Sequence, residues 1–155
     1  VSINKFGVPF YPGEKPWGVK VDIAMPCATQ NEVSLEEAKR IIANGTKYYI
    51  EVANMPTTED ALNLFIDTEG ITVAPSKAVN AGGVCVSGLE MSQNSQRLSW
   101  TAEEVDEKLH HAMINIYNNS VAAAEKYGLG YNLVAGANIA GFEKVAQAMM
   151  EQGIY

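Results

Sequence analysis

Several features that mark particular protein classes are missing from these 155 residues. Two cysteines are too few for a disulfide framework, so we interpret Cys27 and Cys85 as reduced thiols of a cytoplasmic protein. No apolar run approaches the roughly 20 residues that a membrane-spanning helix needs. Lysine and arginine total 11 against 18 acidic residues, which leaves no basic surface for nucleic acid. We therefore expect neither a membrane nor a nucleic-acid partner.

Metal and phosphate motifs are missing as well. There is no HExxH and no CxxC, and His110 and His111 are neighbours, which on a helix do not share a face. We expect no metal site. The segment Gly128-Leu129-Gly130 begins like a GxGxxG fingerprint, but a leucine stands at its last position and a helical pattern precedes it. Its glycines are better explained as a helix cap and a turn.

The N-terminal 20 residues are rich in proline and glycine, which predicts a loop or an arm without regular structure. The chain starts at Val1, without methionine and without an apolar signal segment. We therefore expect that it has been cut from a longer protein.

The hydrophobic content of 47% is sufficient for one packed domain. Short apolar runs at 21–26, 48–53 and 71–74 predict three strands. Capping boxes at Ser34–Glu37 and Thr57–Asp60 open helices between them. Strands that alternate with helices over short turns are typical of an α/β fold, with a parallel sheet flanked by helices.

After Pro75 the pattern becomes helical. We expect a helix over 80–100, a second helix that a Thr101–Glu104 capping box opens and Gly128 ends, and a last helix that stops at Gly153. The last helix carries an apolar face of Phe142, Val145, Ala146, Met149 and Met150.

Ligands of an open parallel sheet bind beyond the carboxyl ends of its strands. The segments there are 27–31, 54–58 and 76–83, and all three are rich in short amides, hydroxyls or glycine. Such groups form hydrogen bonds without carrying charge, which suits a ribose or a carboxamide. Residues 80–83 also open a helix, whose free N–H groups can meet an anion.

Each candidate also has a purely structural explanation. Asn54 and Asn80 could serve turns or caps, and Ser87 could be a surface serine that bonds back to its own helix. Cys27 and Cys85 could be packed thiols, because free cysteine is among the most buried residue types. The coincidence of three polar strand ends favours a ligand site.

Six segments resemble the glutamate dehydrogenase family, in the family's order and at its spacing. They are Pro26-Cys27-Ala28-Thr29-Gln30-Asn31-Glu32, Ala53-Asn54-Met55-Pro56-Thr57-Thr58, Asn80-Ala81-Gly82-Gly83-Val84, Ser87-Gly88-Leu89-Glu90-Met91-Ser92-Gln93-Asn94, Arg97-Leu98-Ser99-Trp100 and Gly136-Ala137-Asn138-Ile139-Ala140-Gly141-Phe142. The resemblance covers essentially the whole chain. The form is similar to the small hexameric bacterial enzymes, especially the clostridial NAD-linked type, in which Glu-Val precedes the second motif as Glu51-Val52 does here.

The resemblance implies an enzyme that interconverts L-glutamate with 2-oxoglutarate and ammonia, using NAD or NADP, with NAD favoured. It implies a homohexameric parent in which residues 1–79 are the second half of a Rossmann-like NAD(P)-binding domain and 80–155 a C-terminal helical region. The glycine fingerprint would lie upstream of Val1. The family's catalytic lysines and aspartate belong to its other domain, so no catalytic residue is expected in this chain.

The resemblance also assigns site residues. For the cofactor, it implies that three residues line the cleft and that two asparagines contact the nicotinamide end. These are Cys27, Ala28 and Thr29, and Asn54 and Asn80. For the substrate, it implies that Ser87 hydrogen-bonds the side-chain carboxylate and that Val84 packs on the substrate carbons.

Two other hypotheses compete with an enzyme part: an independent small-molecule-binding α/β module without catalysis, and a non-enzymatic interaction or regulatory domain. The residues taken alone favour the module, because polar strand ends fit many ligands. The six segments in register favour the enzyme part.

Overall fold

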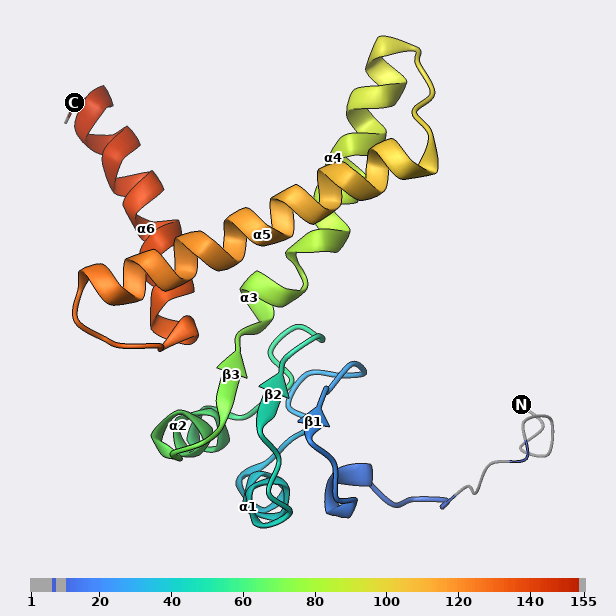
Figure 1. Ribbon diagram of the computed structural model, residues 1–155, viewed down its shortest axis with the longest axis vertical. Helices are drawn as coiled ribbons and strands as arrows, with labels where there is room; N and C mark the ends of the chain where they lie inside the picture. Colours follow the sequence, from blue (N-terminus) through green and yellow to red (C-terminus); the bar gives the residue numbers. More distant parts are fainter. Residues whose placement is uncertain (1–6, 8–10, 154–155) are drawn as a thin grey trace.

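The computed structural model describes Gly7 and residues 11–153 of the chain (Figure 1). Residues 1–6, 8–10 and 154–155, which include part of the predicted N-terminal arm, lie outside the described residues. The elements are the 3₁₀ helix η2 (Pro16–Gly18), the strands β1 (Ile23–Ala24), β2 (Tyr48–Ile50) and β3 (Thr72–Ala74), and the helices α1 (Leu35–Ala43), α2 (Glu59–Asp67), α3 (Ser76–Val79), α4 (Ala81–Gln96), α5 (Ala102–Lys126) and α6 (Leu133–Gln152).

The strands form one parallel sheet in the order β1-β2-β3. Ile23 pairs with Tyr48, and Tyr48 in turn pairs with Thr72. The α/β class with a parallel sheet flanked by helices, followed by C-terminal helices, is thereby confirmed.

The first two strands are shorter than their predicted ranges of 21–26 and 48–53. Beyond Ile50 the backbone N–H groups of Val52 and Ala53 both donate to the carbonyl oxygen of Pro26, over 3.1 and 3.0 Å. The chain therefore turns across the end of β1 instead of extending β2.

One face of the sheet packs against α1 and α2, which lie side by side (Figure 1). Tyr49 in the central strand stacks on Phe65 with ring centroids 3.9 Å apart. Burial raises the pKa of Tyr49, whose hydroxyl lies 2.7 Å from that of Thr57. The buried cluster comprises Ala24, Val33, Ala38, Ile41, Tyr49, Ala61, Phe65 and Val73. Because side chains alternate along a strand, Ile23 belongs to the opposite, exposed face.

Two of the three predicted capping boxes are present. The Ser34 backbone donates to Glu37 over 2.7 Å, and the Thr101 backbone donates to Glu104 over 2.7 Å. The predicted box at Thr57–Asp60 is wrong.

Thr58, not Thr57, caps α2, and its hydroxyl donates to Asp60 over 2.5 Å. Thr57 is buried and its hydroxyl pairs with Tyr49. The Thr57 hydroxyl, which the local pattern assigned to the start of α2, thus forms a hydrogen bond within the sheet core instead.

The predicted helix over 80–100 is confirmed at its start, where Asn80 is the N-cap of α4, but its predicted end at 100 is wrong. The short helix α3 precedes it, Asn80 lies between α3 and α4, and α4 ends at Gln96. Arg97 takes the left-handed conformation, with φ 55°, and the Trp100 backbone N–H donates to the Gln93 side chain over 2.7 Å. These contacts turn the chain so that α5 can run back as a hairpin partner of α4 (Figure 1).

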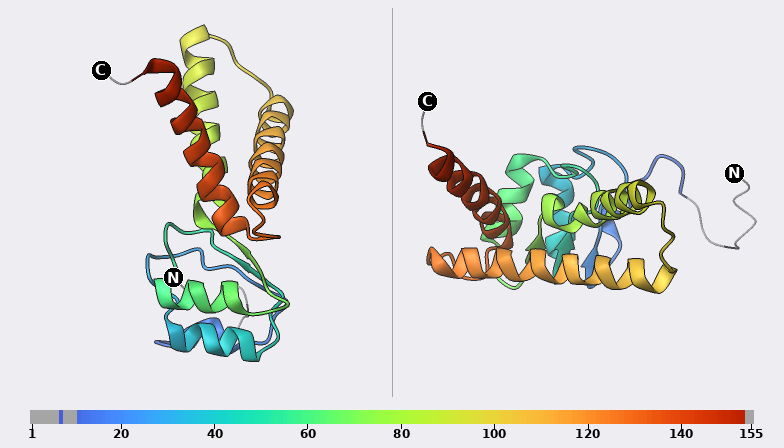
Figure 2. Two further views of the ribbon diagram at one scale, coloured as in Figure 1. Left: turned by 90° about the vertical axis from the view of Figure 1, so that its left-hand side faces the viewer. Right: turned by 90° about the horizontal axis from the view of Figure 1, so that it is seen from above.

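The turn after α5 is the predicted glycine turn. Gly128 and Gly130 both have positive φ, 71° and 60°. Helix α6 then crosses the C-terminal part of α5 and extends beyond it (Figure 2). The second half of α6 has little cover in this chain, since Phe142, Val145 and Met149 are 57–69% exposed.

The crossing depends on a missing side chain at Gly136. A Cβ atom built there would collide with the carbonyl oxygen of Ser120 and lie 3.1 Å from the Cβ of Ala124. Both α5 residues are buried at the contact. Without a Cβ at Gly136, the backbones of α5 and α6 can touch.

We predict that Gly136→Ala lowers the free energy of unfolding by about 1–3 kcal/mol or more, because the added methyl overpacks a backbone contact. The matched control is Gly141→Ala on the same helix, where a Cβ meets nothing within 4 Å. That change should be neutral or stabilising by up to about 1 kcal/mol. Denaturant unfolding of both variants measures the difference. If the Gly136→Ala variant is as stable as the Gly141→Ala variant, the close crossing of α5 and α6 is contradicted.

Candidate functional site

The carboxyl ends of all three strands are joined by hydrogen bonds. The Pro26 carbonyl beyond β1 accepts from Val52 and Ala53 beyond β2. The Glu51 backbone N–H donates to the Ala74 carbonyl over 3.0 Å and thereby links β2 to the end of β3. The three segments predicted from the sequence therefore meet at one edge of the sheet.

The two predicted nicotinamide contacts lie together. The Asn80 Nδ2 donates to the Asn54 Oδ1 over 2.7 Å, although 26 residues separate the two in the chain. This bond leaves one acceptor oxygen on Asn80 and further donor hydrogens on Asn54 for other partners. A paired donor and acceptor is the complement of a carboxamide, so the residues present fit the nicotinamide end of the cofactor.

The loop after β1 carries Cys27, Ala28 and Thr29, and all three are exposed. The expectation that Cys27 is a packed thiol is wrong, because the residue follows the buried Pro26 and lies outside the sheet core. Its Sγ donates to the Met25 carbonyl over 3.3 Å. Cys85 on α4 is half-buried.

Lys15 and two glutamates hold this loop. The Ala28 backbone N–H donates to the Glu32 carboxyl over 3.0 Å, and the Lys15 Nζ donates to the Glu32 carbonyl over 2.8 Å. Lys15 also lies 2.7 Å from Glu37 on α1. Burial by itself raises the pKa of Glu37, but hydrogen bonds from Lys15 and Ser34 outweigh it and lower that pKa from 4.5 to about 2.

The predicted substrate residues lie on α4. Val84 and Ser87 are exposed, and with Asn80 they follow the i, i+4, i+7 spacing that places residues on one side of a helix. The Ser87 hydroxyl donates to the Gly83 carbonyl of its own helix over 3.2 Å. Their contact with a substrate stays a prediction.

Two polar contacts here were not predicted. Lys77 of α3 donates to Asn138 of α6, which joins the third strand end to the sixth family-like segment. Glu51 is 4% exposed, and its carboxyl accepts from the Ser76 backbone N–H over 3.1 Å. The one signal in the sequence for the Glu51 contact was a glutamate within an otherwise apolar run.

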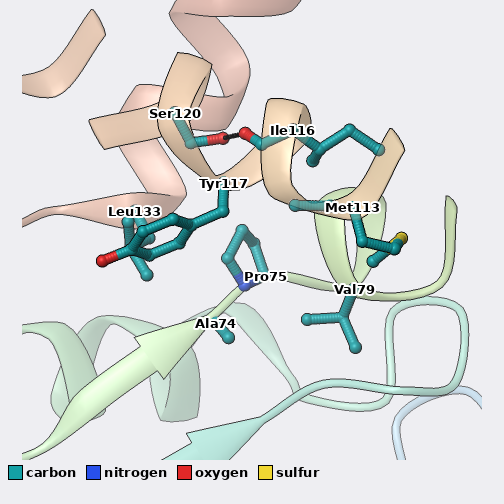
Figure 3. Close-up of a pocket in the computed structure, with 9 residues that line it drawn as sticks. Ala74, Pro75, Val79, Met113, Ile116, Tyr117, Ser120 and Leu133 are labelled. Atoms are coloured by element: carbon teal, nitrogen blue, oxygen red, sulfur yellow. Dashed lines mark hydrogen bonds between the residues drawn. The ribbon is translucent and has the colours of Figure 1, made fainter. Parts of the chain in front are cut away.

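Two hollows of the structure lie elsewhere. Figure 3 shows an apolar one of about 110 Å³, lined by Ala74, Pro75, Ala78, Val79, Met113, Ile116, Tyr117, Ser120 and Leu133. A second, of about 240 Å³, lies under the start of α6 and includes Tyr131 and Asn132. None of the seven predicted site residues lines either hollow. Six of the seven are exposed, and Asn80 is half-buried.

Within residues 11–153, no three His, Cys, Asp or Glu side chains gather as a metal site would require. Over the same part of the chain, no helix combines the length and the apolar character needed to cross a bilayer.

A family model for glutamate/leucine/phenylalanine/valine dehydrogenase matches residues 2–153. The chain belongs to this dehydrogenase family. The NAD-specific glutamate dehydrogenase of Clostridium symbiosum is 72% identical over 151 residues, which are 97% of this chain and 34% of that protein. The NADP-specific enzyme of Salmonella typhi is 54% identical over 154 residues, 97% of this chain and 33% of its own length. The chain thus spans about a third of the length of the curated relatives it matches.

Solved structures agree with the family. A glutamate dehydrogenase superimposes with a TM-score of 0.94 at 73% identity, over 97% of this chain and 33% of that one. The Plasmodium falciparum glutamate dehydrogenase gives a TM-score of 0.88 at 55% identity, over 94% and 31%. The fold of the chain is therefore that of one part of these enzymes.

We predict that Glu37 makes folding pH-dependent in a defined window. Its pKa is lower in the folded chain, so its contribution to stability is complete above pH 4.5 and is lost as the pH falls toward 2. Carbon-13 NMR titration of the Glu37 carboxyl should show the low pKa, and Lys15→Met should raise it.

The matched control for this prediction is Glu36 on the same helix, which pairs with Lys39 at the surface. Glu37→Gln should flatten the pH dependence of the unfolding free energy between pH 4.5 and about 2 more than Glu36→Gln does. Equal effects would show that the contacts of Glu37 with Lys15 and Ser34 do not lower its pKa.

Proposed function

We propose that the chain is the cofactor-side part of an NAD(P)-dependent glutamate dehydrogenase, which oxidatively deaminates L-glutamate to 2-oxoglutarate and ammonia. The observation that carries the proposal is the Asn54–Asn80 amide pair, at the point where three strand ends meet in a chain of this family. Residues 1–79 would be the second half of the NAD(P)-binding domain and 80–155 the C-terminal helical region.

In this proposal the strand ends hold the cofactor. Cys27, Ala28 and Thr29 form the exposed wall of the cleft. Asn54 and Asn80 orient the carboxamide of the nicotinamide, which supplies hydride transfer when bound. NAD is favoured over NADP, because a relative with 72% identity is NAD-specific.

The substrate lies beside the nicotinamide, along the side of α4 that follows Asn80. Ser87 donates to the distal carboxylate of glutamate, and Val84 packs against the carbons between the two carboxylates. A hydroxyl at Ser87 thus selects glutamate among the amino acids that the family name spans, since leucine, phenylalanine and valine have no second carboxylate.

The catalytic lysines belong to the part of the parent enzyme outside this chain. Among the described residues, two lysines lie near the strand ends and both have partners: Lys77 donates to Asn138, and Lys15 pairs with Glu37. The parent is proposed to be a cytoplasmic homohexamer, as the resemblance implies.

Ser87→Ala in the full-length enzyme should weaken glutamate binding. Removing a hydrogen bond to a charged carboxylate costs on the order of 1.5–3 kcal/mol, which corresponds to roughly 10- to 150-fold in kcat/KM. Discrimination against a substrate without the distal carboxylate, such as norvaline, should shrink. The measurement is steady-state kinetics with both amino acids at saturating cofactor.

Ser92→Ala is the matched control. Ser92 is also exposed on α4 and its hydroxyl also bonds back one turn, to the Gly88 carbonyl over 2.9 Å. That variant should keep wild-type kinetics. If Ser87→Ala behaves like Ser92→Ala, then Ser87 is a passive helical serine and the substrate assignment fails.

The isolated chain should produce no NADH from glutamate. Oxidative deamination requires a general base and a cation at the reacting carbon. The described lysines near the strand ends, Lys15 and Lys77, are already bonded to Glu37 and Asn138. Cofactor binding should also be weak, because the helix N-terminus that holds the pyrophosphate is not in this half. Calorimetry with NADH tests the second point. Micromolar binding by the isolated chain would favour the alternative, an independent small-molecule-binding module.

A further inference from the structure

Glu51 bonds to the end of β3 on both sides of Pro75. Pro75 itself has no backbone N–H to donate. The Glu51 backbone N–H bonds to Ala74 just before that proline, and the Glu51 carboxyl accepts from Ser76 just after it. Glu51, which is 4% exposed, thus bonds to the residues before and after Pro75.

From Ser76 the contacts continue to the candidate site. Helix α3 is one turn long, and the Asn80 backbone N–H that closes it donates to the Ser76 carbonyl over 2.9 Å. The Asn80 side chain then donates to Asn54, three residues after Glu51. The intervening Val52 and Ala53 are fixed to Pro26. The bonds and the two chain segments therefore form a closed ring that starts and ends at Glu51.

We propose that Glu51 is a positioning residue for the cofactor: its carboxyl fixes α3 against the end of β2, and thereby sets Asn80 in register with Asn54 for the nicotinamide. The inference rests on the proposed cofactor role of these asparagines. Glu51 is buried and acts through its bond to α3, not by touching the ligand.

The Ser76 contact uses only a backbone N–H, which permits a sharp test in the full-length enzyme. Ser76→Pro removes that donor alone, because Ser76 is the first residue of α3, where proline fits, and Pro75 is already extended with ψ 147°. Ser76→Ala keeps the donor. We expect Ser76→Pro to raise the KM for NAD about tenfold, as small misplacements of binding groups do, with the KM for glutamate within about twofold of wild type. Ser76→Ala should match wild type.

The same bond is tested from its other side. Glu51→Gln keeps an acceptor oxygen in place and should keep the KM for NAD within about threefold of wild type, whereas Glu51→Ala should raise it as Ser76→Pro does. Tyr49→Phe removes a different buried hydrogen bond of the same sheet and should leave the KM for NAD unchanged. If Tyr49→Phe raises it equally, general loosening explains the effect and the proposal is overturned.

A double-mutant cycle separates this inference from the proposed function. If Glu51 acts through Asn80, Glu51→Ala should add little to Asn80→Ala in the KM for NAD, and the two effects should be strongly non-additive. Additive effects would overturn the positioning role. If Asn80→Ala and Asn54→Ala leave cofactor kinetics unchanged, the proposed cofactor site itself fails. If the two asparagine variants change cofactor kinetics while Ser76→Pro and Glu51→Ala do not, only the positioning role of Glu51 is contradicted.

Discussion

Parallel pairing of the central strand β2 with both of its neighbours determines where everything else in this chain can lie. Parallel strands all end at the same edge, so the pairing of the strands brings three segments far apart in sequence together there. The helices that return the chain must then cover a face of the sheet, and α1 and α2 share one face through the buried ring of Tyr49.

Buried polar groups are matched to partners throughout this arrangement. Among the described residues, every buried side-chain nitrogen or oxygen that is out of contact with solvent has a hydrogen-bond partner. Thr46 donates to the Val21 carbonyl and Ser120 to that of Ile116. An unmatched buried polar group costs about 1–3 kcal/mol, a large part of a domain's net stability. The sheet edge can therefore be polar enough to meet a cofactor and still be a stable part of the fold.

The sequence was informative where structure depends on near neighbours in the chain. The capping boxes at Ser34 and Thr101 and the turn at Gly128 each use contacts within a few residues, and all were predicted correctly. Thr57 was assigned wrongly because a tyrosine eight residues away takes its hydroxyl.

The candidate site divides in the same way. Its residues were named from three strand ends and a family resemblance, but the direct bond between Asn54 and Asn80 spans 26 residues and depends on strand order and on the break between α3 and α4. The burial of Glu51 depends on the same geometry, which no local pattern encodes. Single-sequence patterns identify such groups far better than they identify which of them touch.

The glycine crossing also has a mechanical consequence. Helix α6 meets α5 at Gly136 and again at Glu143, which pairs with Lys126 at the end of α5. The nine residues from Lys144 to Gln152 extend about 14 Å beyond that pair at 1.5 Å per residue. A tilt of about 5° of this end carries its tip through about 1 Å, on the rise per residue of an α-helix. Because Lys77 joins α6 to the third strand end through Asn138, close to the backbone crossing, such a tilt hardly moves the strand-end contact.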